Sequence, residues 1–375
     1  MWLQCLTLEE TLQSHHVNLK DRMNLKETDL FQPLIVVVAI LAFLAMGYIG
    51  SFNYRFEDPL DLEVILTILF ACLAFMAGLA IVKFKVKVEN IKKTDFLSEK
   101  LLVICVLIAL ILQAVNLILI GGIPLFNSVL KSNATTNIWR VAYPLFLIMI
   151  NVLLAKYYDR KYLLLVVLGA VIFALNGYRT SVLGILASAF ITLYYLGRIS
   201  KKVGIAFVAA IIITVMAIGY IASQSIATQQ WTLNPIELVF YRAGFTLEVF
   251  ERILPLAGTT HGHILSMIFS SGSPRTFVGQ YVLSDNVCLT STLFGPVMLD
   301  FGLIGLAVQM LFMGLFLGMM DKIKKGIGIG IYSIILTHTL IWIETGPTDI
   351  MIWFLYLIGF VLIAINFTHI NLNKD

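Results

Sequence analysis

The sequence predicts an all-α polytopic membrane protein, with about ten transmembrane helices and one long external loop that carries an amphipathic helix. Hydrophobic residues make up 59% of the 375 residues and charged residues only 13%, whereas soluble domains carry about 25% charged residues. The mean hydropathy is +0.92. The charged residues also gather between long apolar runs, which is the pattern of a chain that crosses a membrane several times.

Apolar runs of about 17–25 residues, the length that spans a bilayer, divide the chain into four parts. Residues 1–31 are polar and lack the apolar core of a signal peptide, so we expect a cytoplasmic N-terminal tail. Residues 32–222 hold a first membrane bundle of about seven spans, and residues 223–291 form the external loop. Residues 292–375 hold the last three spans and a short C-terminal tail. The predicted spans lie near 32–52, 60–82, 101–121, 139–156, 162–178, 180–197, 203–222, 292–319, 327–343 and 349–367.

The basic residues indicate the orientation, because loops on the cytoplasmic side of a membrane are enriched in lysine and arginine. With the N-terminus inside, 19 of the 26 basic residues fall on the cytoplasmic side, and 16 of these are lysines. The seven outside are Lys131 and six arginines, and arginine is the side chain that suits phosphate recognition. We therefore expect a multi-pass protein of the cell (cytoplasmic) membrane whose outer face binds an anion. The alternative is that these arginines extend to the membrane interface or pair with nearby acids.

The external loop contains an amphipathic helix over residues 234–255. Asn234 is a suitable N-cap, and Glu237 follows three residues later, as in a capping box. Glu248 and Arg252 can pair at the i, i+4 spacing. Arg242 has no acid at its i−4, i+3 or i+4 positions, so we expect it to face an anionic substrate and to act in catalysis. The apolar stripe of the helix is Ile236, Phe240, Ala243, Leu247, Phe250 and Leu254.

Three more outer arginines are candidates for the site. Arg179, in the stretch N-G-Y-R-T-S, begins the sixth span, where a cation opposes the helix macrodipole and so suggests a catalytic role rather than a stabilising one. The free N–H groups at that helix end would add to an anion site. Arg140 and Arg275 are expected to bind the substrate.

Two histidines and three acids complete the candidate residues. His261 is a candidate general base and His263 a candidate substrate-binding residue, although both could equally be solvated loop residues. Asp300 lies just inside a span, where a charge is costly and therefore suggests a catalytic function. Glu344 and Asp349, in a short outer turn, either bind a sugar hydroxyl of the substrate or counter the arginines.

No metal and no other cofactor is expected. The sequence contains no D-x-D, no H-E-x-x-H and no phosphate-binding glycine loop. Two histidines without a third ligand do not make a zinc site. Gly314 and Gly318 form a small-xxx-small pair, which suits close packing of two helices.

Four short stretches resemble the oligosaccharide repeat-unit polymerase family, the O-antigen polymerases. They are G-G-I-P-L-F at 121–126, G-Y-R-T at 177–180, Y-R at 241–242 and L-F-G-P-V-M-L-D-F-G-L-I-G at 293–305. The resemblance implies a metal-independent membrane glycosyltransferase of the GT-C type, which moves a growing glycan from one polyprenyl-pyrophosphate carrier onto another lipid-linked unit. It also implies that Arg179 and Arg242 hold the lipid phosphates. The implied partners are a polyprenyl-pyrophosphate-linked oligosaccharide, membrane lipids, a flippase and a chain-length regulator, and no nucleic acid.

Three alternatives stay open beside a polymerase. Related O-antigen ligases carry a histidine ahead of the span that matches 292–319, where this chain has Asn286–Val287–Cys288. This departure favours a polymerase over a ligase-like glycan transferase and leaves the identity of the general base open. A lipid-linked glycan flippase or other transporter is the second alternative, although such proteins usually show charges near mid-membrane and repeated halves. A scaffold without enzymatic activity is the third.

Overall fold

The computed structural model describes residues 29–53, 58–88, 97–199, 201–224, 233–270, 273–285, 287–366 and 370–372. Residues 1–28 of the predicted N-terminal tail lie outside these ranges, as do Arg55 and Asn286. The helices are α2 (Ile35–Asn53), α3 (Leu62–Lys85), α4 (Glu99–Ile120), α5 (Ser128–Ser132), α6 (Asn137–Tyr157), α7 (Lys161–Ala174), α8 (Arg179–Tyr195), α9 (Lys201–Gln224), α10 (Pro235–Ile253), α11 (His263–Ile268), α12 (Pro274–Leu283), α13 (Gly295–Lys322), α14 (Ile327–Thr345) and α15 (Ile350–Ile365). Two 3-10 turns, η1 (Pro124–Phe126) and η2 (Leu254–Leu256), join them.

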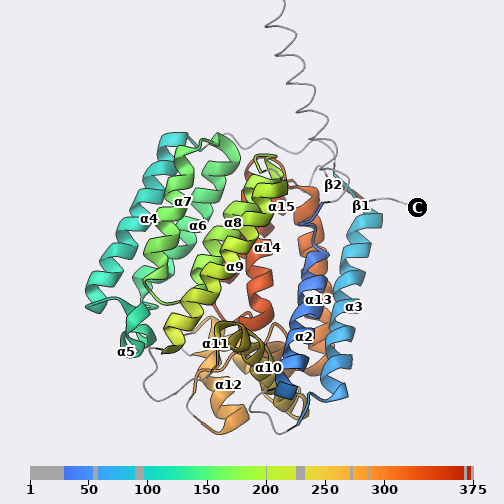
Figure 1. Ribbon diagram of the computed structural model, residues 1–375. Coiled ribbons are helices and arrows are strands. Elements are labelled where there is room, and N and C mark those ends of the chain that lie inside the picture. The colour runs from blue at the N-terminus through green and yellow to red at the C-terminus, as the bar shows by residue number, and fades with distance from the viewer. Residues whose placement is uncertain are drawn as a thin grey trace, which may run out of the picture.

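The long helices run side by side as one bundle, and α5, α10, α11 and α12 gather at one of its ends (Figure 1). At the opposite end, β1 (Val86–Val88) pairs antiparallel with β2 (Ile370–Leu372). This short sheet ties the C-terminal part of the chain to the end of α3. The bundle therefore has two distinct ends, and the predicted external loop forms one of them.

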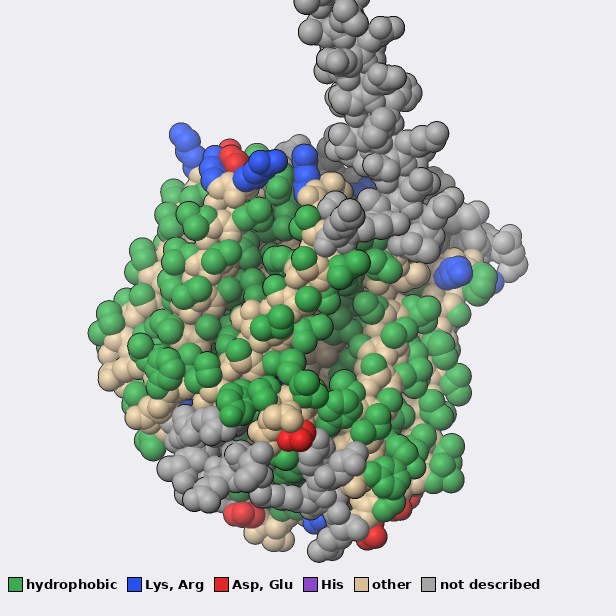
Figure 2. Space-filling model, in the orientation of Figure 1, with side chains coloured by type: hydrophobic (Ala, Val, Ile, Leu, Met, Phe, Trp, Pro, Cys, Tyr) green, Lys and Arg blue, Asp and Glu red, His purple; other side chains and the backbone are tan. Residues whose placement is uncertain are grey.

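The protein is a multi-pass membrane protein. Seven helices (α2, α3, α4, α6, α9, α13 and α14) are long and apolar enough to cross a membrane, and α7, α8 and α15 are apolar but shorter. Each of the ten predicted spans coincides with one of these helices, while the number of membrane crossings stays a prediction. Figure 2 shows hydrophobic side chains over most of the visible face between the two ends, with lysines and arginines gathered at the end that holds the α6–α7 turn.

The predicted amphipathic helix is present as α10. Asn234 accepts hydrogen bonds from the N–H groups of Ile236 and Glu237, at 3.0 and 2.9 Å, and its own N–H donates to the Glu237 carboxylate at 2.8 Å. This is the predicted capping box. The predicted pair also forms, since Arg252 Nε donates to Glu248 Oε1 at 3.0 Å. Of the predicted apolar stripe, Ala243, Leu247, Phe250 and Leu254 are buried, whereas Ile236 in the first turn is exposed.

Glycines bring helix backbones into direct contact at two places. A Cβ at Gly50 of α2 would overlap the backbone of Phe240 in α10, and one at Gly314 of α13 would overlap the carbonyl of Phe75 in α3. A Cβ at Gly318 would lie 3.1 Å from Cβ of Val82. The predicted small-xxx-small packing of α13 is thus confirmed, with α3 as its partner. The equivalent contact on α2 holds α10 against the bundle, and α10 carries Arg242.

A buried polar cluster fixes α8 against α6. The side-chain amide of Asn151 donates to Ser188 Oγ at 2.9 Å, and Thr192 Oγ1 donates to Asn151 Oδ1 at 2.8 Å. All three side chains are buried. Polar side chains that pair across helices inside a membrane hold the helices together. The cluster therefore fixes the helix that begins with Arg179.

We expect Gly314→Ala to destabilise the protein measurably, because the added methyl group meets the α3 backbone and forces the two helices apart. Gly204→Ala in α9 is the matched control. A Cβ there has its nearest neighbour at an ordinary 3.6 Å, and alanine favours a helix over glycine. Thermal unfolding of both purified variants in detergent tests this, and equal midpoints would contradict close packing of α3 on α13.

Candidate anion-binding site

Arg179 and Arg242 meet at a single carboxylate oxygen. Arg179 Nη2 and Arg242 Nε both donate to Glu344 Oε1, the second at 3.2 Å. The three side chains come from the start of α8, the middle of α10 and the end of α14. The structure thus brings together the two arginines proposed for phosphate binding. It also places the predicted residue Glu344 between them, where it counters both charges.

Two backbone turns pack together to place Arg179. The Leu125 N–H in the G-G-I-P-L-F turn donates to the Leu175 carbonyl at 2.9 Å, and a Cβ at Gly177 would lie 3.1 Å from the Leu125 backbone. Gly177 adopts a φ of +73°, which favours glycine. Two of the predicted motifs, 121–126 and 177–180, are therefore in contact, and their packing orients the first turn of α8.

The ion cluster is partly buried and still has hydrogen-bonding capacity. The side chains of Arg179 and Glu344 are each 25% exposed, and that of Arg242 is 38% exposed. A guanidinium offers five N–H donors. In the described part of the chain, Arg179 donates only to Glu344, and Arg242 donates to Glu344 and, at 3.4 Å, to Thr290 Oγ1. Several donors of the pair are therefore available to a second anion.

Further cations surround the pair. Lys131 of α5 lies near Arg179 and Arg242. Burial lowers the pKa of Lys131 from its ordinary value, and the positive charges of the two arginines lower this pKa further. Two guanidiniums and one carboxylate leave a net charge of +1, and Lys131 adds to it. The local potential is thus positive, and a bound anion would stabilise the protonated Lys131.

Arg275 and Asp349 line a small cavity of about 50 Å³, which also borders Thr180 and Thr345, the residues next to Arg179 and Glu344. Arg275 Nε donates to Thr348 Oγ1 at 2.9 Å. Asp349 Oδ1 accepts the Met351 N–H at 3.2 Å as the N-cap of α15. The structure thus brings the predicted residues Arg275 and Asp349 together on one cavity, which is bordered by the chain neighbours of Arg179 and Glu344.

The floor of this cavity contains groups that the sequence interpretation missed. His338 Nδ1 lies 2.9 Å from the Ile334 carbonyl, which can only accept, so Nδ1 carries the proton. Its Nε2 then accepts from the Tyr143 hydroxyl at 3.2 Å. The buried indole N–H of Trp139, which also borders the cavity, has no hydrogen-bond partner. The signal that could have identified His338 is an ionisable residue within an apolar span. No local signal identifies Trp139, or Thr290, whose hydroxyl accepts from Arg242.

The remaining candidate residues lie elsewhere in the structure. Arg140 is exposed, and its guanidinium lies 3.5 Å from Asn137 on its own helix. His263 is exposed, with its ring 4.9 Å from the ring of Phe277. His261 is exposed and borders an apolar groove along α13. Among the described residues, none of these three contacts the arginine pair.

Asp300 holds the loop around α11 in place. Its carboxylate accepts hydrogen bonds from Thr260 Oγ1 at 2.5 Å, from the Ile264 N–H at 3.0 Å and from the Leu265 N–H at 2.8 Å. These donors include the free N–H groups at the start of α11, which an acid stabilises. The side chain is buried with both oxygens occupied, so we assign it a structural role.

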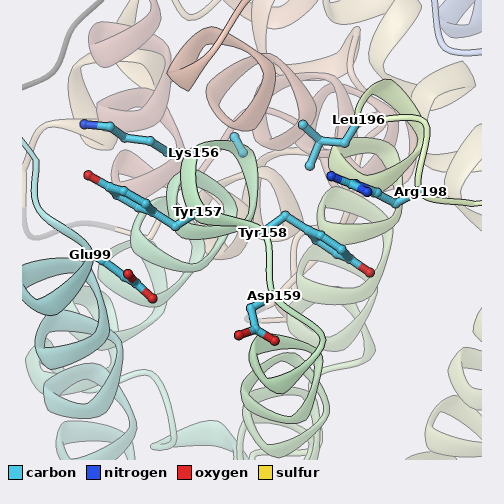
Figure 3. A pocket seen from close by; sticks show the side chains of 8 residues that line it. Glu99, Lys156, Tyr157, Tyr158, Asp159, Leu196 and Arg198 are labelled. Atoms are coloured by element: carbon cyan, nitrogen blue, oxygen red, sulfur yellow. The ribbon is translucent and has the colours of Figure 1, made fainter. Parts of the chain in front are cut away.

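A second polar pocket of about 460 Å³ lies at the opposite end of the bundle (Figure 3). The Arg198 guanidinium stacks on the ring of Tyr158 at 4.8 Å, and Lys156 Nζ donates to the Leu97 carbonyl at 2.9 Å. Basic and aromatic residues of this kind are typical of a membrane interface. This pocket contains none of the predicted site residues.

The fold and the site define a polytopic membrane protein with a cationic site at one end of its bundle. A family model described as "Putative O-antigen polymerase" matches residues 29–356, and the chain belongs to that family. It is 28% identical over 267 residues to uncharacterized protein MJ0419 of Methanocaldococcus jannaschii, covering 68% of this chain and 73% of the relative. It is also 28% identical over 314 residues to uncharacterized protein MJ0420 of the same organism, covering 82% and 72%. No solved structure matches the chain.

The described residues contain no group of three or more histidine, cysteine, aspartate or glutamate side chains that could hold a metal ion. The charged groups around the site are arginines, Lys131 and the carboxylates of Glu344 and Asp349. Such an arrangement can bind a diphosphate through bidentate hydrogen bonds and hold it in place while charge develops on it.

Glu344→Gln should destabilise the protein by roughly 1–3 kcal/mol, because it leaves two neighbouring, partly buried guanidiniums without their counter-charge. Glu248→Gln is the matched control, since it removes a carboxylate of similar exposure that pairs with one arginine only, Arg252, at the i, i+4 spacing, a pair worth about 0.5 kcal/mol or less. Thermal unfolding in detergent compares the two. Equal, small losses would contradict a structural role for the shared carboxylate.

Proposed function

We propose that this protein is a metal-independent glycosyltransferase that polymerises lipid-linked oligosaccharide repeat units. In this proposal it acts on the outer face of the cytoplasmic membrane and displaces polyprenyl pyrophosphate. Family membership supports a membrane role in glycan assembly. The observation that supports the proposal is that Arg179 and Arg242 both donate to one oxygen of Glu344 and keep further N–H groups that can bind a second anion.

The reaction needs charge stabilisation more than a strong nucleophile. The hydroxyl oxygen of the acceptor sugar forms a bond to the anomeric carbon of the donor, and the bond from that carbon to the diphosphate oxygen breaks. The diphosphate leaves with the electron pair, and the hydroxyl proton passes to a base. Arg179 and Arg242, both fixed before the substrate arrives, hold the diphosphate and stabilise the charge that it gains.

Asp349 is the carboxylate best placed to take the proton. It borders the small cavity together with Arg275, and among the described residues no donor reaches its second oxygen, Oδ2. Glu344, by contrast, is held by two guanidiniums, which disfavour its protonation. A general base must lie within hydrogen-bonding reach of the acceptor hydroxyl, so the proposal requires the acceptor sugar to bind with a hydroxyl next to Asp349.

Arg179→Ala and Arg242→Ala should each slow chain elongation by about 10²-fold or more, because each removes charge stabilisation from the departing diphosphate. Arg252→Ala is the matched control on the same helix as Arg242, and it should elongate normally because Arg252 pairs with Glu248 on the exposed side of α10. The measurement is the ladder of products that purified protein forms from lipid-linked repeat units in vesicles.

The same assay separates the alternative functions. A ladder with the unmodified protein that is lost in both arginine variants supports the polymerase. A single addition without a ladder would instead indicate a ligase-like transferase. Movement of the lipid-linked unit across the bilayer without a new glycosidic bond would indicate a transporter, and either of these results overturns the proposal.

Asp349→Asn should slow transfer by about 10²-fold without weakening the binding of the lipid-linked donor, because general-base catalysis is lost while the charge-binding arginines remain. Asparagine is also a good N-cap, so α15 should keep its start. Single-turnover transfer and donor binding, measured on the same preparation, check this. An unchanged transfer rate would exclude Asp349 as the base.

A further inference from the structure

An apolar groove of about 850 Å³ runs along α13, between α11 and the turn before α15. Its length along α13, from Asp300 to Phe312, is about 18 Å at 1.5 Å per residue. Its volume lies in the range of about 300–1,000 Å³ that ligand pockets occupy. The lining side chains that matter here are Leu265, Ile304, Val308, Phe312, Pro347 and Trp353.

The groove opens on the face of α13 that meets lipid. Ile304 is 81% exposed and Val308 61% exposed, and α13 is one of the helices long and apolar enough to cross a membrane. In a bilayer these side chains face hydrocarbon, so the occupant of the groove is an apolar chain that reaches it from within the membrane.

One end of the groove is polar and fixed. Helix α13 is broken at Gly302, where φ is 62° and ψ is −157°. The break frees two carbonyls, and the N–H groups of Gly258 and Thr260 donate to them, Gly258 to Met298 O at 2.9 Å and Thr260 to Leu299 O at 3.1 Å. The groove thus begins at a rigid polar junction near the membrane surface and continues into apolar surroundings.

Two short segments connect this groove to the arginine pair. The end of α14 contributes Glu344 to the arginines, and the turn that follows it contributes Pro347 to the groove. The segment before α13 contributes Thr290, which accepts from Arg242, and the first turn of α13 contributes Pro296, which lines the groove. The turns also touch, since a Cβ at Gly346 would lie 2.8 Å from the Thr292 carbonyl. The cationic site and the groove are therefore the head and tail positions for one amphiphile.

We propose that the groove along α13 holds the isoprenoid chain of the lipid carrier whose diphosphate lies at Arg179 and Arg242. This inference rests on the proposed function, because it takes the diphosphate at the arginine pair as given. It adds the path of the chain, which leaves the headgroup beside Pro347 and follows α13 past Ile304 and Val308 toward Phe312. The groove then sets the angle at which the anomeric carbon faces the acceptor.

The test is photo-crosslinking of the full-length protein in nanodiscs of phosphatidylcholine and phosphatidylglycerol. One probe is a long-chain polyprenyl diphosphate with a diazirine in the middle of its chain. The matched probe is the polyprenol with the same diazirine and no diphosphate. We expect the diphosphate probe to label the α13 peptide that contains Ile304–Phe312, and to do so about tenfold more than the polyprenol.

Val308→Trp fills the groove and should reduce this labelling by about tenfold, because the packing penalty of an added bulky side chain changes an equilibrium by that order. Val167→Trp on α7 is the matched control. Val167 is similarly exposed, at 55%, but is not part of the groove lining, so the variant should label like the unmodified protein. Normal unfolding midpoints for both variants show that the fold is intact.

Equal labelling of α13 by the two probes would mean that ordinary membrane lipid fills the groove, and it would overturn the inference. Undiminished labelling of Val308→Trp would overturn it as well. Labelling reports binding and not transfer, so these results are separate from the elongation assay. If the arginine variants lose elongation while both probes label α13 equally, the proposed function is supported and only the inference about the groove is overturned.

Discussion

Two guanidiniums on one carboxylate oxygen form the interaction on which the rest of the site depends. Alone, Arg179 and Arg242 would repel each other at this spacing, and partial burial would strengthen the repulsion. Glu344 holds them together but neutralises only one of the two charges. The result is a site that is assembled before any ligand arrives and that still carries a net positive charge. This preorganisation is what a reaction with a diphosphate leaving group requires of a protein.

The fold positions these three side chains by close backbone contact rather than by large side chains. Gly47 and Gly50 allow α10 to lie directly on α2, and a Cβ at Gly47 would overlap the Leu247 side chain. The polar cluster around Asn151 holds α8 against α6. In a bilayer there is no hydrophobic driving force between helices, so close packing and buried hydrogen bonds are the available means of holding them. Errors in either would move an arginine away from Glu344.

Local rules predicted much of this structure. Apolar run length located ten apolar helices, and N-cap chemistry located the start of α10. Arg242 was predicted as a site residue because no acid lies at its helical neighbours, and Arg179 because it begins a span. The pairing of these side chains could not be predicted, because Glu344 is 165 residues from Arg179 in the sequence and 102 residues from Arg242. Asp300 was chosen for its costly location, yet its position is explained by the backbone of α11 that it caps. Composition and periodicity describe single helices, whereas a site between helices depends on their packing.

The break in α13 has a consequence for how this family can diverge. The freed carbonyls of Met298 and Leu299 are bonded by main-chain N–H groups of the loop before α11. Main-chain donors are common to every residue except proline, so side chains around the junction can be exchanged without losing those two bonds. Positions 302 and 258 are restricted, because both glycines have a positive φ, of 62° and 76°, which residues with a Cβ rarely adopt. Distant relatives can therefore keep the same bend, and reshape the groove beside it for a different lipid, while sharing few side chains.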